Sequence, residues 1–175
     1  NLRNTELCKC ENSELLALVS YLNDQSFDVS SAIPASGQIK AQLNDYFEQN
    51  NWSEKFVFDG NIPKTINRAN FTLDGIKDLA QEIACEYKHR FFLEACFDNR
   101  QAIGTNLLKF VTAQNKYEEK ASCRGLAFLI CGDKRTLKNL GWDGSIGSSE
   151  EYEFALRNPY QQILKYAPIL LVLRG

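Results

Sequence analysis

One carboxylate stands inside an apolar segment of the chain: Glu94, in FFLEACF, residues 91–97. Burying a carboxylate without a partner is costly, so such a group is normally paired, protonated, bound to a metal ion or turned toward a cleft. Because side chains two apart share one face of a strand, Cys96 would point the same way as Glu94. Nucleases that use metal ions need two or three convergent carboxylates and a polar or basic group two positions along the strand. Glu94 is therefore the first candidate for a catalytic, metal-binding residue.

Other reactive residues give weaker signals. The six cysteines stand at positions 8, 10, 85, 96, 123 and 131. In a chain that can build its own core they are expected to be reduced thiols. Cys85 and Cys96 leave open a thiol or metal role as an alternative. His89 is the only histidine, which argues against Ser–His or Cys–His catalysis unless His89 itself is the base, and it is expected at a solvated strand start. No glycine-rich phosphate loop follows a strand.

Alternating helical and apolar extended segments surround these residues and predict an α/β fold. Extended segments are expected near residue 56, at 89–97, at 124–131 and at 167–175, the last two fully buried. Apolar spacing predicts helices at 15–22, 37–50, 73–87, 101–112, 133–141 and 150–167, with a break before Pro159. The segment 115–122 is expected to be a charged surface loop. The fold class is an α/β domain with a mixed central sheet flanked by helices.

The expected helix at 73–87 decides how the upstream acids are interpreted. Leu73, Ile76 and Leu79 recur at helical spacing. Asp74, Asp78 and Glu82 would then lie on its solvated face, away from any site.

Length and charge limit the kind of protein. The chain of 175 residues fits one domain, 1–175, and its net charge of −2 argues against a strongly basic surface while leaving room for a local basic face. No apolar run is long enough for a membrane span, and the polar start shows no secretory signal, so a cytoplasmic location is expected.

Several segments, in order, resemble type II restriction endonucleases of the BglII/BstYI kind, in the PD-(D/E)XK superfamily. LEACFDNRQAIGTNLLKF resembles the core strand and helix, and RGLAFLIC the next strand. SGQIKAQLNDYFEQNNWSEK resembles the family's early helix, and EEYEFALRNPYQQILKYAPILLVLRG the closing helix and strand. The resemblance implies a restriction-endonuclease-like sheet, a homodimer around double-stranded DNA, and Mg²⁺ at a carboxylate cluster.

Transferred residue by residue, the resemblance gives an incomplete site. Glu94 matches the metal-binding glutamate, but Cys96 stands where the family has Gln, Lys or Glu. Cys85 stands nine residues earlier, where the family has an aspartate. Glu86 is the expected second metal ligand. The favoured interpretation is a DNA-binding protein with a degenerate catalytic site. The alternatives are an active Mg²⁺-dependent site-specific endodeoxyribonuclease and a protein-interaction partner without DNA affinity.

DNA contact is predicted for residues near the site strand and on the short helix at 133–141. Polar and basic side chains there could reach phosphates or base edges. The candidates are Asn99, Arg100, Lys109, Lys134, Arg135 and Lys138.

Overall fold

The computed structural model describes residues 9–24, 35–56, 71–79, 88–97, 99–121, 123–142 and 144–174. Within them, none of the helices combines the length and apolar character that crossing a bilayer requires. The elements are α1 (Lys9–Asp24), α2 (Ala35–Gln49), β1 (Ser53–Phe56), β2 (Thr72–Asp78), β3 (Lys88–Ala95), the 3₁₀ turn η2 (Arg100–Ala102), α3 (Ile103–Ala121), β4 (Cys123–Gly132), α4 (Lys134–Asn139), α5 (Ser149–Arg157) and β5 (Ile169–Leu173).

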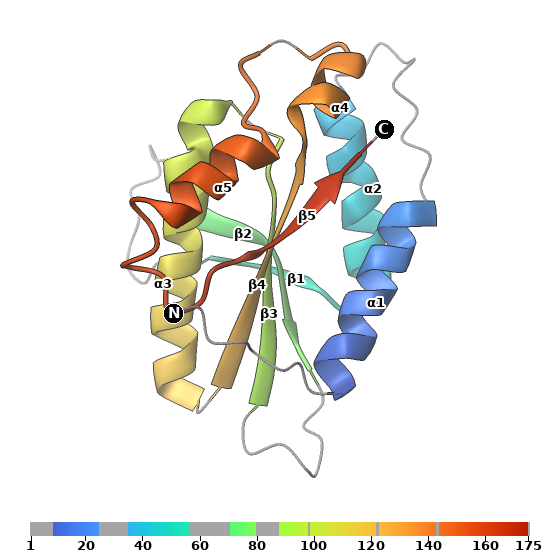
Figure 1. Ribbon diagram of the computed structural model, residues 1–175. Helices are drawn as coiled ribbons and strands as arrows, with labels where there is room; N and C mark the ends of the chain where they lie inside the picture. Colours follow the sequence, from blue (N-terminus) through green and yellow to red (C-terminus); the bar gives the residue numbers. More distant parts are fainter. Residues whose placement is uncertain are drawn as a thin grey trace, which may run out of the picture.

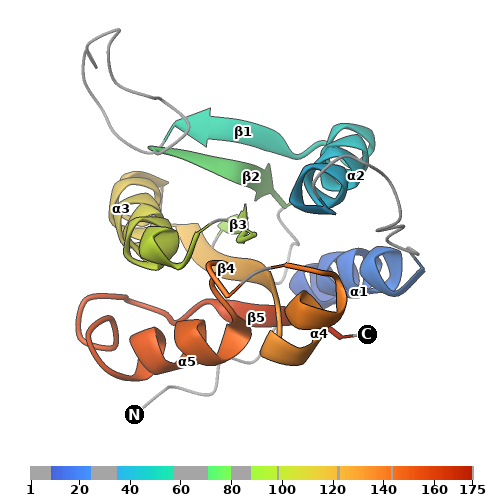
Figure 2. The ribbon, with the colours of Figure 1, turned by 90° about the horizontal axis from the view of Figure 1, so that it is seen from above.

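The strands form one five-stranded sheet in the order β1-β2-β3-β4-β5. β2 runs antiparallel to both of its neighbours, β1 and β3, and β3, β4 and β5 run parallel. The connection from β3 to its parallel neighbour β4 runs through α3. Helices α1 and α2 cover one face of the sheet, and α3 and α5 cover the other (Figures 1 and 2). The predicted α/β fold with a mixed, helix-flanked sheet is confirmed.

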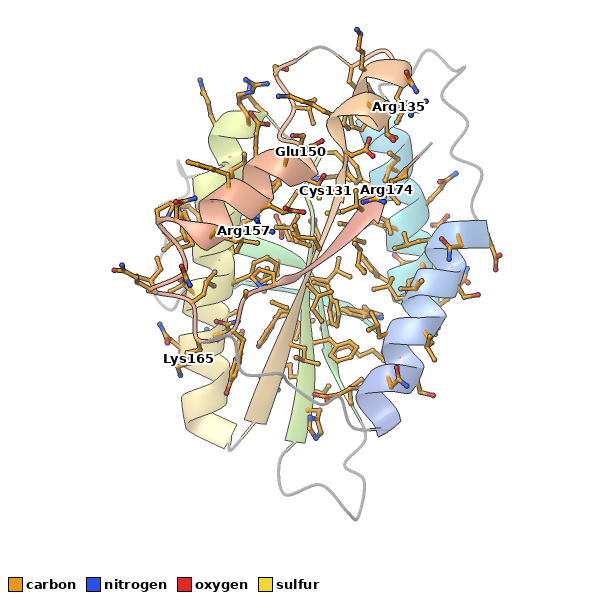
Figure 3. The ribbon with its side chains drawn as sticks, viewed as in Figure 1. Cys131, Arg135, Glu150, Arg157, Lys165 and Arg174 are labelled. Atoms are coloured by element: carbon orange, nitrogen blue, oxygen red, sulfur yellow. The ribbon has the colours of Figure 1, made fainter. Side chains whose placement is uncertain are left out.

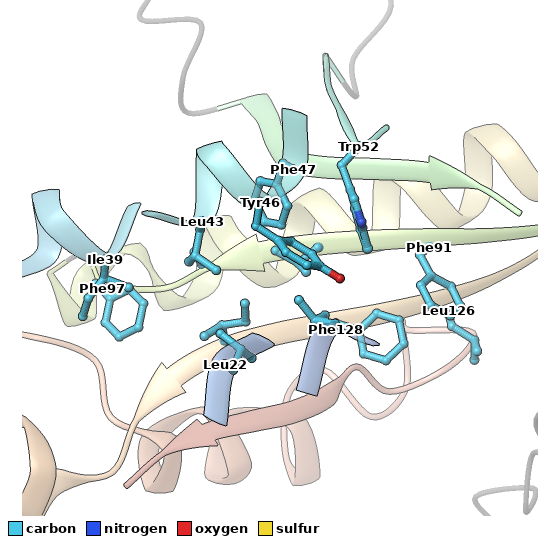
Figure 4. Close-up of a cluster of buried hydrophobic side chains, with 14 of the residues drawn as sticks. Leu22, Ile39, Leu43, Tyr46, Phe47, Trp52, Phe91, Phe97, Leu126 and Phe128 are labelled. Carbon is cyan, nitrogen blue, oxygen red and sulfur yellow. The ribbon is translucent and has the colours of Figure 1, made fainter. Parts of the chain in front are cut away.

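Alternation along β3 divides its large side chains between two cores. Phe91, Leu93 and Ala95 join the core under α1 and α2, which Figure 4 shows in close-up. Phe92 and Cys96 join the core under α3 and α5. β4 alternates in the same way, with every residue from 125 to 132 buried. The continuous apolar run of β4 therefore marks a strand covered on both faces, as predicted.

The prediction of a helix at 73–87 is wrong for the described residues of that range, because residues 72–78 form strand β2. Two pairs in the β1–β2 ladder explain the misleading spacing: Ser53 pairs with Ile76, but Lys55 pairs with Leu73. Two steps along β1 thus match three along β2, a local irregularity of the bulge type. It places Leu73 and Ile76 in the same core, which imitates a helical repeat. Residues 80–87 lie outside the described ranges.

Three further boundaries differ from expectation. The helix expected at 150–167 ends at Arg157, and no helix resumes in the described residues after the predicted break before Pro159. Helix α3 continues to Ala121, through residues expected to form a loop, because Lys and Glu are good helix formers and need no exit at a charged run. β5 is a strand, as predicted, but it pairs only with β4 and its residues are half-buried or exposed. It is an edge strand of the described sheet rather than a buried one.

Candidate active site

Asp74 and Glu94 meet across the antiparallel pair of β2 and β3. Gly75 pairs with Leu93, so the next pair in the register is Asp74 opposite Glu94. The Asp74 backbone N–H donates to Oε2 of Glu94 at 3.3 Å. The Ala95 N–H donates to Oδ2 of Asp74 at 2.8 Å. Each carboxylate is thus tied to the backbone of the other strand, and the two acids converge on one point.

Lys109 reaches the same point from helix α3. Its Nζ donates to Oε1 of Glu94 and forms an ion pair in which the side chains are 6% and 1% exposed. α3 lies on the sheet through Leu107, Phe110 and Ala113, which carries Lys109 inward. Desolvating two charges is costly unless the geometry and further hydrogen bonds offset it. The backbone N–H of Asp74 supplies such a bond to Glu94.

The pKa of Glu94 is raised to about 8. Burial is the main cause, and the negative charge of Asp74 adds to it. Lys109 and the Asp74 backbone N–H act in the opposite direction without cancelling them. Without a bound cation, this position therefore favours a proton near neutral pH. A divalent cation between the acids would relieve the same repulsion.

Cys96 lies two residues after Glu94 and points to the same side of the sheet, but its side chain is buried in the core. It is 1% exposed, and its Sγ accepts a hydrogen bond from Nδ2 of Asn106 at 3.4 Å. Burial raises the pKa of this thiol well above its ordinary value, and the charge of Glu94 adds to the shift. Cys96 is therefore a neutral thiol, and the positive charge beside Glu94 comes from Lys109 instead.

Among the described residues, the acid that lies beside Glu94 is Asp74. Glu86, the expected second ligand, and Cys85 lie outside the described residues. The described partner of Glu94 is Asp74, and its assignment to a solvated helix face is wrong because β2 is a strand. The signal available in the sequence was LDG, an acid beside a glycine in a short apolar stretch twenty residues before Glu94. The apolar spacing around it masked that signal.

The donor set fits Mg²⁺ better than a softer metal. The described residues contain no group of three or more His, Cys, Asp or Glu side chains that could hold a metal ion. Mg²⁺ usually takes one or two carboxylates, keeps several waters and completes its shell with substrate phosphates. The Asp74–Glu94 pair meets that requirement. A structural zinc site would require four protein ligands.

The predicted DNA-contacting residues fall into three groups. Lys109 is 5% exposed and paired with Glu94, which places it inside the site rather than on a surface. Asn99 and Arg100 are exposed beyond the end of β3. Arg100 donates to the Gly144 carbonyl and lies 3.6 Å from Glu151. Lys134, Arg135 and Lys138 are exposed on α4.

Helix α4 lies at the end of the sheet nearest the acids. Glu94 pairs with Leu129, three positions before the last residue of β4, and α4 begins two residues after β4 ends. Figure 3 labels Arg135 on this helix, beyond the ends of β4 and β5. Asp133 caps α4 by accepting from the Thr136 N–H at 2.7 Å, which fixes where its basic residues stand.

His89 lies outside this site, near the start of β3. It is 4% exposed, and its Nδ1 lies 2.7 Å from Oε1 of Glu11 on α1. The expectation of a solvated strand start is wrong at this residue, because α1 covers it. The pair joins α1 to the sheet and is several residues away from Glu94.

No protein-family model matches the chain, and no curated protein matches it either.

Proposed function

We propose that the protein is a Mg²⁺-dependent endodeoxyribonuclease that acts on double-stranded DNA, as the resemblance to type II restriction endonucleases implies. The observation that carries the proposal is the convergence of Asp74, Glu94 and Lys109 from β2, β3 and α3. The sequence favoured a degenerate site because Cys96 and Cys85 stand where the family has catalytic groups. With Asp74 as second acid and Lys109 as the cation, both missing roles have a candidate.

Each residue has a role that its contacts support. Asp74 and Glu94 would hold Mg²⁺, which when bound would polarise the scissile phosphate and activate a water molecule. The Ala95 and Asp74 N–H groups orient the two carboxylates before any ligand arrives. Lys109 favours the ionised form of Glu94, which the metal requires, and brings positive charge to a place where negative charge develops on phosphate.

The basic residues beyond the strand ends support duplex DNA as the substrate. Arg100 and the α4 residues Lys134, Arg135 and Lys138 are exposed at the end of the sheet that carries the acids. Such contacts position the backbone of a duplex near a cleavage site without reading its sequence. They also allow DNA binding by a chain whose net charge is −2.

A homodimer remains part of the proposal because cutting both strands of a duplex needs two sites. Phe154 is 69% exposed on α5, between Glu150 and Arg157 on the exposed side of that helix. Two copies paired antiparallel about Phe154 would bring the acidic end of one helix to the Arg157 end of the other. Sedimentation equilibrium of the wild type and of Phe154→Glu tests this arrangement.

The direct test is cleavage of long unmethylated plasmid DNA in Mg²⁺ or Mn²⁺. Discrete fragments are expected from the wild type, and from Asp45→Asn as the control, because Asp45 is an exposed acid on α2. Asp74→Asn, Glu94→Gln and Lys109→Met should each lose about 100-fold or more in rate. Cleavage that persists in Asp74→Asn would contradict the assignment of the second acid.

Intact DNA would divide the remaining possibilities. A salt-sensitive shift without cleavage would support a DNA-binding protein whose catalysis has decayed, the interpretation that Cys96 favours. Neither cleavage nor a shift would support a protein-interaction partner. A thiol role for Cys85 and Cys96 receives no support from Cys96, whose thiol is buried and held neutral.

A further inference from the structure

A second polar contact joins β3 to α3 beside the Glu94–Lys109 pair. Nδ2 of Asn106 donates to Sγ of Cys96 at 3.4 Å and to Oη of Tyr152 at 3.2 Å. The three side chains are each 2% exposed or less. Asn106 lies on α3, Tyr152 lies on α5 and Cys96 directly follows the last residue of β3; the three meet in the core under α3 and α5.

The two contacts are consecutive links between the same strand and the same helix. Cys96 directly follows β3, its N–H still bonds the Ile130 carbonyl of β4 at 2.7 Å, and it shares a face with Glu94 two residues earlier. Asn106 and Lys109 are three apart on α3 and are neighbours on the helix surface. Cys96–Asn106 and Glu94–Lys109 therefore fix the helix against the strand at two successive positions.

A polar residue at position 106 needs an explanation, since the inward positions 107, 110 and 113 of α3 are apolar. A buried amide must find hydrogen-bond partners. An amide that lacks one destabilises the fold relative to an apolar side chain of similar size at the same position. In return, a satisfied polar contact restricts the helix to one position along the strand, whereas apolar packing tolerates small shifts.

We infer that Asn106 and Tyr152 are positioning residues for the proposed nuclease site: Tyr152 holds Asn106 on Cys96, and this contact sets the point at which Lys109 reaches Glu94. The inference rests on the proposed function for its catalytic consequence. The placement of Lys109 itself does not depend on that function. Cys96 then has a definite role, as the neutral acceptor that anchors the helix.

The test removes one hydroxyl group at a time from two tyrosines that contact α3 at different points along the helix. Tyr152→Phe removes the partner of Asn106 and keeps the ring. Tyr160→Phe is the matched control, because Oη of Tyr160 also binds α3, at the Gly104 carbonyl at 3.0 Å, without touching the network. Both tyrosines carry a ring that the substitution preserves, so both variants are expected to fold.

The first readout needs neither metal nor DNA. A buried, paired lysine ammonium exchanges its protons slowly, so the ¹H–¹⁵N signal of Lys109 should be visible in the wild type and in Tyr160→Phe. It should broaden or disappear in Tyr152→Phe. An unchanged Lys109 signal in Tyr152→Phe, or equal loss in both variants, would overturn the inference whether or not the protein cleaves DNA.

The second readout separates positioning from general stability. In a cleaving protein, Tyr152→Phe should lower kcat roughly 10-fold or more at nearly unchanged KM, since small displacements of a catalytic group are costly. Cys96→Ser keeps an acceptor for Asn106 and should retain the Lys109 signal, whereas Cys96→Ala should lose it. Equal behaviour of the Ser and Ala variants would contradict the role given to Cys96.

Discussion

The two faces of the sheet are buried to a similar degree but contain different chemistry. Under α1 and α2, aromatic rings follow one another: Trp52 lies 6.1 Å from Phe91, and Phe91 lies 4.6 Å from Phe128, measured between ring centroids (Figure 4). Under α3 and α5, the same strand β3 presents Glu94 and Cys96 to Lys109 and Asn106. Apart from the His89–Glu11 pair near the start of β3, the face under α1 and α2 is stabilised by apolar contact. The face under α3 and α5 holds desolvated charged and polar groups in fixed places, which offsets part of its apolar stabilisation.

The two faces should respond differently to mutations. Removing atoms from the aromatic face should always destabilise the fold, because apolar contact is lost and a cavity remains. Removing charges in matched pairs from the polar face should cost little or increase stability, because desolvated charges are replaced by apolar groups. Four predictions test this difference, beginning with the largest effect.

Phe91→Ala should produce the largest loss of stability. Phe91 is fully buried between Trp52 and Phe128, and phenylalanine-to-alanine changes in such cores cost about 3–5 kcal/mol. Urea unfolding should show a lower midpoint with an unchanged slope. Leu16→Ala is the control, since Leu16 is 61% exposed on α1 and its removal should change stability by less than about 0.5 kcal/mol. Similar losses in both variants would remove the distinction between core and surface.

Lys109→Met should destabilise the fold by an amount that depends on pH. At pH 9 the wild type gains stability by ionising Glu94 beside Lys109, and the variant loses that gain, so the loss should exceed the loss at pH 6 by up to about 1.4 kcal/mol. At pH 6 Glu94 carries a proton, because its pKa of about 8 can only rise when Lys109 is removed, so the loss should be small. Urea unfolding at the two pH values measures the difference.

The double variant Glu94→Gln with Lys109→Met sharpens this prediction. It removes both charges together and should be as stable as the wild type or more so at either pH. A double variant less stable than Lys109→Met alone would show that the polar face contributes to stability as the aromatic face does, and the comparison would fail.

Gly75→Ala should have an intermediate effect on the aromatic face. A Cβ at this position would lie 2.8 Å from Cε3 of Trp52, so the indole ring or strand β2 must move. Overpacking of this kind costs about 1–3 kcal/mol. Gly144→Ala is the control, because the nearest atom to its Cβ is the end of the Arg100 side chain at 3.8 Å. Thermal unfolding of the two variants checks the difference, and an equal shift in Tm would show that Trp52 can yield.

Gly75 also marks the place where sequence reasoning failed. The apolar runs of β3 and β4 and their two-sided burial were predictable, because a strand covered on both faces needs continuous apolar residues. Asp74 was not, because the irregular β1–β2 pairing produces a spacing of Leu73 and Ile76 that is typical of a helix. Local pattern cannot reveal a register that depends on another strand.

Lys109 was assigned to DNA contact for a similar reason. A lysine on an amphipathic helix usually lies on the solvated side, and only the docking of α3 onto β3 shows that this one is buried. The contact joins residues fifteen apart in the chain and on different elements. Glu94 itself could be singled out, because a carboxylate inside an apolar strand is unusual on any fold.

The last prediction is a pH dependence of stability that comes from Glu94. In the folded protein its pKa is about 8, above the ordinary value of 4.5, so between these values the folded state holds a proton that the unfolded state has released. Stability in EDTA should therefore fall as pH rises from about 5 to 8, by at most about 1.4 kcal/mol per pH unit from this group.

Glu94→Gln should remove this slope, while Asp45→Asn should keep it. If Glu94 holds Mg²⁺ as proposed, the ion must compete with the proton, so Mg²⁺ at about 10 mM should stabilise the wild type more at pH 8.5 than at pH 6. It should stabilise Glu94→Gln at neither pH. A wild-type slope that survives in Glu94→Gln would assign the pH dependence to another group. It would also leave the polar face without the cost that distinguishes it from the aromatic one.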